Sequence, residues 1–149
     1  MVDTQLNTLI IRLDRELYAL PSSAIREVAR YRDITPIPGA PAVFPGIISQ
    51  RGAIIPVADI RPLLGLDTPQ TTRSSRLVLL VHEETDVALH ADAVLDLTAI
   101  DPESVSPAPS AIDPSRGRLL SGIARADEQP VMMIDLGAVI GALRGVGAS

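Results

Sequence analysis

Short apolar stretches, each ended after a few residues by glycine, proline or charged residues, recur along the 149-residue chain. The first, Leu9–Leu13, is followed by a charged turn and a second apolar stretch, Leu17–Leu20. The same arrangement returns at Leu77–Val81 and Val87–Leu89. Short strands at intervals of about 8–12 residues are typical of β-sandwiches and barrels. The pattern therefore predicts an all-β protein with short helical turns between its strands.

Two further apolar stretches, Phe44–Ile48 and Ala53–Ile60, flank a polar tip at Ser49–Gly52. Such a tip is typical of a β-hairpin turn, in which Gly52 can adopt the positive φ that other residues resist. Arg51 then becomes a single cation held out between two apolar strands. The stretch contains no catalytic group, so it predicts a surface that is presented to a partner.

The chain also contains an internal duplication. A shift of 69 positions places Leu9–Leu13 on Val78–His82, and a shift of 76 positions places Asp59 on Asp135. Strands rich in Val, Ile and Leu can match by chance, but glycines and aspartates that match at fixed offsets favour a true repeat.

The two copies span about residues 7–66 and 76–142, and a polar linker, 67–75, joins them. The larger second shift implies about seven extra residues in the second copy, which we place in 107–118. We predict that each half forms a small five-stranded barrel and that the two barrels pack together within one domain.

Composition excludes several classes of function. The net charge of −5 disfavours nucleic acids and anionic membranes, which both attract basic surfaces. The chain has no cysteine, which excludes disulfides and thiol chemistry. The first residues show no signal-peptide pattern, and no apolar run approaches the roughly 20 residues of a spanning helix. We therefore expect a cytoplasmic protein.

Asp59 and Asp135 are the candidates for acid–base chemistry. As a carboxylate pair they would indicate a small hydrolase or a ligand-binding barrel, which needs the two groups in one cleft. Their equivalence in the duplication favours instead a capping role for each, at the turns Arg61–Leu64 and Gly137–Ile140. No nucleotide, zinc-protease or serine-hydrolase motif is present. We expect no catalytic residue, no cofactor and no metal site.

The order of these segments resembles the CheW-like coupling domain of bacterial chemotaxis over about residues 9–143. The first-half segments that carry the resemblance are Leu17–Leu20, Ile25–Val28, Ile34–Pro38, Gly46–Ile48, Arg51–Gly52, Ile55–Arg61 and Leu63–Leu66. The second-half segments are Ala88–Val94, Ser121–Ile123 and Met133–Leu136. The chain departs from the family at Ser49-Gln50, where the family usually has Asn-Leu.

The resemblance implies two five-stranded SH3-like barrels and a non-enzymatic adaptor. Such an adaptor joins the helical cytoplasmic tip of a chemoreceptor to the regulatory domain of the histidine kinase CheA. It is expected to be monomeric alone and to assemble with its partners into membrane-associated arrays. A flagellar pathway and another chemosensory pathway, such as surface motility or second-messenger control, both remain open.

The resemblance also implies two sets of contact residues. The set for the receptor is Ile25, Glu27, Arg51, Gly52, Ala53 and Val94. The set for the kinase is Ile37, Ala42 and Val43, in the proline-rich loop. Structural alternatives are that Glu27 and Arg51 form only a surface ion pair, and that Ile25 and Val94 belong to the core.

Overall fold

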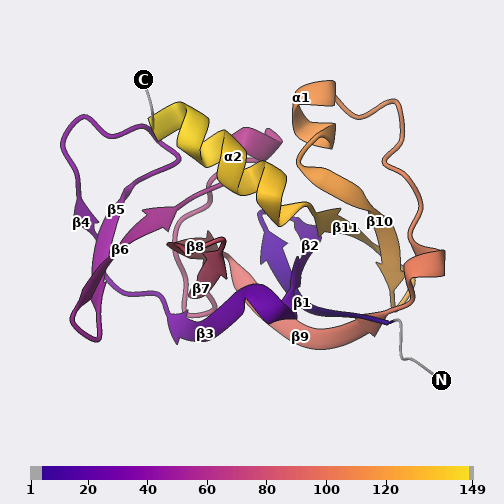
Figure 1. Cartoon of the computed structure of the whole chain (residues 1–149), viewed down its shortest axis with the longest axis horizontal. Helices are drawn as coiled ribbons and strands as arrows, with labels where there is room; N and C mark the ends of the chain where they lie inside the picture. The colour runs from indigo at the N-terminus through magenta and orange to yellow at the C-terminus, as the bar shows by residue number, and fades with distance from the viewer. Residues whose placement is uncertain (1–4, 148–149) are drawn as a thin grey trace.

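The computed structural model describes residues 5–147, which form two β-sheets with a C-terminal helix lying across them (Figure 1). Strands dominate, which confirms the predicted all-β class. The first half contains β1 (Leu6–Leu13), β2 (Glu16–Pro21), the 3₁₀ turn η1 (Ser22–Ala24), β3 (Ile25–Arg30), β4 (Thr35–Pro36), β5 (Gly46–Gln50), β6 (Ala53–Ala58) and η2 (Pro62–Leu64). The second half contains β7 (Arg76–His82), β8 (Thr85–Ala91), β9 (Ala93–Ile100), η3 (Pro102–Ser104), α1 (Pro114–Gly117), β10 (Leu120–Ala126), β11 (Gln129–Ile134) and α2 (Leu136–Gly147).

The duplication is confirmed by the pairing register of the strands. Leu9 lies opposite Leu20 in the β1–β2 hairpin, and their equivalents Val78 and Leu89 lie opposite each other in β7–β8. The irregularities are duplicated too, because β3 and β9 each carry a bulge at the same place in their pairing with β7 and β1. The offset of 69 positions found in the sequence is therefore a structural equivalence.

The sheets do not follow the two halves of the chain. The five-stranded sheet has the order β10-β11-β2-β1-β9, and the six-stranded sheet has the order β3-β7-β8-β6-β5-β4. Each N-terminal hairpin, β1–β2 or β7–β8, thus joins the strands of the other half. Neither sheet is therefore built only from the strands of 7–66 or of 76–142, the ranges predicted for the two barrels.

The short connections between strands explain the exchange. In the structure β9 pairs antiparallel with β1, which is itself antiparallel to β2. If β3 took the place of β9 beside β1, it would therefore run parallel to β2. A parallel connection needs a crossover of about a dozen residues or more. Only the three residues of η1 separate β2 from β3, and Asp92 alone separates β8 from β9. The chain must therefore leave each hairpin and enter the other sheet.

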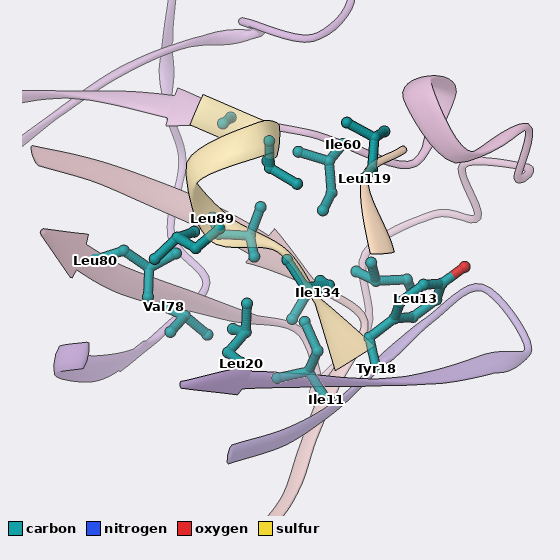
Figure 2. Close-up of a cluster of buried hydrophobic side chains, with 14 of the residues drawn as sticks. Ile11, Leu13, Tyr18, Leu20, Ile60, Val78, Leu80, Leu89, Leu119 and Ile134 are labelled. Carbon is teal, nitrogen blue, oxygen red and sulfur yellow. The ribbon is translucent and has the colours of Figure 1, made fainter. Parts of the chain in front are cut away.

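The main core lies between the two sheets, and Figure 2 shows its side chains meeting there. Ile11 and Leu20 enter it from the five-stranded sheet, while Val78 and Leu89 enter it from the six-stranded sheet. Strand β1 is buried on both faces, because Ile10 packs into a second cluster on the opposite side. Burial on both faces explains why β1 and β7 have continuous apolar sequences instead of alternating ones.

Two equivalent glycines allow a neighbouring segment to approach closely. A Cβ on Gly46 would lie 2.3 Å from the carbonyl oxygen of Thr35. Thr35 belongs to β4, which pairs with β5, the strand that contains Gly46. A Cβ on Gly122 would lie 2.7 Å from the carbonyl oxygen of Ser106, which bridges to Ile123. Any side chain at either position would push away the strand segment that crosses there.

Helix α2 was not predicted, because only a turn was expected at 137–140. The helix runs over 12 residues and packs on the main core. Asp135 caps it, since its Oδ1 accepts a hydrogen bond from the backbone N–H of Ala138 at 3.1 Å. This confirms the capping role predicted for Asp135. The helical signal was present, since buried apolar residues recur at helical spacing, at Leu136, Val139, Ile140 and Leu143.

Candidate functional site

The tip of the β5–β6 hairpin is a two-residue turn formed by Arg51 and Gly52. Both residues have positive φ, at 50° and 84°, which is typical of the type I′ turns that fit the twist of a hairpin. The prediction for Gly52 is confirmed. Arg51 adopts the same left-handed backbone, which non-glycine residues seldom do, and its side chain is 81% exposed.

A hollow of about 480 Å³ lies beside this tip. The six-stranded sheet curls there. As a result, the side chain of Glu27 on edge strand β3 reaches the side chain of Gln50 on β5, near the opposite edge of the sheet. Apolar residues of β6, β7 and β8 line the hollow together with charged residues of β3, β8 and the tip. Of the apolar ones, those of β7 and β8 are buried, whereas Ala53 of β6 is exposed and Ile55 is partly buried. The lining residues are Arg26, Glu27, Gln50, Arg51, Ala53, Ile55, Leu79, Leu80, Asp86 and Val87.

The charged groups around the hollow form two ion pairs. Arg51 Nη2 lies 3.5 Å from Glu27 Oε2, and Arg26 Nη2 lies 4.0 Å from Asp86 Oδ1. Glu27 is the less exposed partner of its pair, and its Oε2 also accepts a hydrogen bond from Gln50 Nε2 at 3.1 Å. Exposed pairs of this kind contribute about 0–1 kcal/mol to stability, so they orient the paired side chains more than they stabilise the fold.

The structure gathers part of the receptor set around this hollow. Glu27, Arg51 and Ala53 line it, and Gly52 completes the turn beside it. Ile25 and Val94 do not line it. These two are partly buried and pack against the core between the sheets, as the structural alternative expected.

The kinase set is divided by burial. Ile37 is 45% exposed and Ala42 is also exposed, so both side chains are available to a partner. Val43 is only 5% exposed and belongs to the main core, which corrects its placement on the surface. The backbone of Val43 is also anchored at this place, because its carbonyl oxygen accepts a hydrogen bond from the N–H of Asp59.

Sequence reasoning missed two polar side chains beside the tip. Arg32 Nη2 donates to the backbone oxygen of Ser49 at 2.7 Å and to Gln50 Oε1 at 2.6 Å. Gln50 lines the hollow directly. A signal was available, because Gln50 stands where the resembling family usually has leucine.

Asp59 belongs to a buried polar cluster and not to a carboxylate pair with Asp135. Its two oxygens accept from Nε and Nη2 of Arg61, each at 2.9 Å. Asp92 Oδ1 accepts from Nη1 of the same guanidinium at 2.7 Å, and His90 Nδ1 lies 3.2 Å from Nη2. Asp135 is instead engaged at the start of α2.

The surroundings of His90 favour its neutral form. Burial lowers the pKa of His90 from its ordinary value, and the neighbouring Arg61 cation lowers it further. Tyr31 packs on the ring with centroids 4.7 Å apart. Within residues 5–147, no group of three His, Asp or Glu side chains is arranged to hold a metal ion.

Comparison with known proteins places this geometry in a family. A crystal structure of the scaffolding protein TtCheW from Thermoanaerobacter tengcongensis matches with a TM-score of 0.80 and 31% identity, over 91% of this chain and 87% of that one. The chemotaxis protein CheW of Rhizobium meliloti is 24% identical over 86% of this chain and 83% of its own length. Protein FrzA of Myxococcus xanthus is 28% identical over 74% of this chain and 69% of its own length.

No helix in the described part of the chain is long and apolar enough to cross a membrane. The family model for the CheW-like domain matches residues 7–144, which is nearly the whole chain. The fold, the duplicated hairpins and these similarities lead to one conclusion. The chain belongs to the CheW-like domain family, whose members serve as non-enzymatic adaptors in chemotaxis signalling.

Proposed function

We propose that this chain couples the cytoplasmic tips of chemoreceptors to a CheA-type histidine kinase. Its membership of the CheW-like family supports an adaptor role. The hollow beside the β5–β6 tip supports a receptor contact there, because accessible apolar residues, Ala53 and Ile55, next to charged ones suit the amphipathic face of a helix. In this role the protein acts in the cytoplasm and is recruited to membrane-associated receptor arrays.

One observation carries the receptor assignment. Arg51 is displayed in a left-handed conformation at the edge of the hollow, and its pair with Glu27 leaves most of the guanidinium exposed. A purely structural pair gains little from such exposure. We therefore assign Glu27, Arg51, Gly52 and Ala53 to the receptor contact. Ile25 and Val94 remain candidates only through their partly exposed edges.

The kinase contact is assigned to a different face. Ile37 and Ala42 lie exposed on the loop that connects β4 with β5. This loop contains several prolines, which reduce the conformational entropy that is lost when a loop is fixed in an interface. Two separate faces would allow one chain to hold both partners simultaneously.

The test is a pull-down of the full chain with a receptor cytoplasmic fragment and a CheA-type kinase from the same organism, separately and together. We expect capture of each partner alone and of both in one complex. Capture of neither would refute the coupling role. Repeating the pull-down with receptor fragments from a flagellar and from another chemosensory pathway would distinguish the two.

A further inference from the structure

A continuous series of polar contacts runs beside the tip hollow. Arg32 donates to Gln50 Oε1 at 2.6 Å, and Gln50 Nε2 donates to Glu27 Oε2 at 3.1 Å. Arg51 reaches the same oxygen of Glu27 at 3.5 Å. The series joins the segment after β3, the β5–β6 hairpin and β3 itself, and Gln50 is its central member.

The duplicated copy shows that the hairpin does not need this series. The positions equivalent to Gln50 and Arg51 are Ala126 and Asp127 in the β10–β11 hairpin. That turn has the same backbone, with φ of 50° at Asp127 and 67° at Glu128. An alanine thus stands where Gln50 stands, and the turn forms without a side chain that could bridge. The contacts of Gln50 are therefore not needed to shape the turn.

Gln50 can impose one arrangement on its neighbours because its side-chain amide is directional. Arg32 has only donors, so it holds the amide oxygen of Gln50 on its own side. The amide N–H groups must then face Glu27, where one of them donates to Oε2. Gln50 and Arg51 both contact Oε2 of Glu27. Oε1 of Glu27 and the other N–H groups of Arg51 can therefore bind a partner.

We propose that Gln50, anchored by Arg32, is a positioning residue that fixes the charges of the tip hollow and so determines which helical segment the hollow accepts. This inference rests on the proposed receptor contact. The matching segment has an apolar face for Ala53, which is exposed, and for Ile55, which is partly buried. It also carries an acidic side chain for Arg51. A leucine at position 50 would leave Glu27 and Arg51 free to rotate, and would relax this preference.

The experiment measures the affinity of the full chain for a receptor cytoplasmic fragment by isothermal titration calorimetry. Gln50→Ala should weaken binding about 3- to 10-fold while the protein stays folded, because Glu27 and Arg51 are no longer held in one arrangement. Gln50→Glu should weaken it further, because this variant keeps the contact with Arg32 and sets a second carboxylate against Glu27. Gln129→Ala, in the duplicated hairpin, is the matched control and should bind like the wild type.

A double-mutant cycle separates positioning from a direct contact. In a Glu27→Ala background, Gln50→Ala should change the affinity by less than about 2-fold, since the group that it positions is gone. An equal loss in both backgrounds, or an unchanged affinity for Gln50→Ala, would overturn the inference. If the wild type binds and Arg51→Glu abolishes binding while Gln50→Ala is silent, only this inference fails. If the wild type does not bind the fragment, the receptor contact and the inference fail together.

Discussion

Arg61 and Asp92 form a buried ion pair that connects the two sheets. Nη1 of Arg61, which precedes η2, lies 2.7 Å from Oδ1 of Asp92 between β8 and β9. The other oxygen of Asp92 accepts a hydrogen bond from the backbone N–H of Asp14, in the β1–β2 turn of the five-stranded sheet. The side chain of Arg61 is only 3% exposed, so its charge depends on these partners.

We predict that Arg61→Ala lowers the free energy of unfolding by about 3–5 kcal/mol, because the substitution leaves two buried carboxylates without their cation. Urea unfolding followed by circular dichroism measures the change. Arg125→Ala, at an exposed position, is the control and should shift stability by less than about 0.5 kcal/mol. A loss for Arg61→Ala as small as that of the control would show that the cluster adjusts around the missing cation.

Acidification should destabilise the protein through His90. The ordinary pKa of 6.5 applies to the unfolded chain, whereas burial and Arg61 lower the pKa in the fold. The unfolded chain therefore takes up a proton first, so the free energy of unfolding is highest above pH 6.5 and falls as the pH decreases below that value. Asp59 and Asp92 face the same cluster, and their opposing effect limits the slope. Equilibrium unfolding of the wild type and His90→Gln at several pH values tests this, and an equal slope in both would contradict it.

Gly46→Ala should destabilise the protein by about 1–3 kcal/mol, because the new Cβ would collide with the backbone of Thr35 and displace β4. Gly141→Ala is the matched comparison, since a Cβ there meets nothing within 4 Å. It replaces a glycine inside α2 and should stabilise the chain by about 0.5–1 kcal/mol. Thermal and urea unfolding of both variants should give shifts of opposite sign, and shifts of the same sign would contradict the packing around Gly46.

Arg51→Glu should leave the fold intact and reduce capture of the receptor fragment, while kinase capture stays unchanged. The double variant Glu27→Arg/Arg51→Glu restores an ion pair of reversed polarity. If the pair only stabilises the surface, the double variant will bind the receptor like the wild type. We expect it to remain defective, because a partner would meet the wrong charge at each position.

Asp135→Ala should cost about 0.5–2 kcal/mol, because α2 loses the side chain that caps its N-terminus. Urea unfolding measures this cost, and Asp135→Ser should recover most of it, since serine is also an effective cap. A variant as stable as the wild type would show that packing on the core alone holds the first turn of α2.

Most of the strands were predictable, because apolar stretches and the turn residues that end them act locally. The duplication could be found from Gly46 and Asp59 with their equivalents, and each of these positions has a physical reason to persist. Gly46 leaves room for the backbone of Thr35 beside it, and the Asp59 and Asp135 carboxylates each accept a hydrogen bond from a backbone N–H in the turn that follows. Such constraints fix the residue type, so they remain visible when other positions have diverged.

The exchange of hairpins was not predictable from hydrophobic pattern alone. The two copies bury equivalent residues, such as Leu20 and Leu89, so either hairpin satisfies either sheet. Only the short β2–β3 and β8–β9 connections determine which hairpin joins which sheet, and the prediction did not include their length. Helix α2 was missed for a different reason, because the equivalence of Asp135 with Asp59 suggested a turn although the apolar spacing indicated a helix.

The candidate site was predicted where a charge or a glycine stands out in an apolar stretch, as Arg51 and Gly52 do. Gln50 and Arg32 were missed, because their importance comes from mutual contacts between segments that are distant along the chain. Val43 was misplaced because prolines on both sides suggested an exposed loop, whereas the loop turns its valine into the core.

The exchanged hairpins also bear on how such a chain could have arisen. A protein with one copy of the repeat would carry a hairpin that its own remaining strands cannot pair with, because the connection is too short. Such a protein would fold only as a domain-swapped homodimer, with each subunit lending its hairpin to the other. Gene fusion through a linker like 67–75 would turn that dimer into one polypeptide. Its two surfaces could then diverge, so that one keeps Arg51 at its tip and the other Asp127.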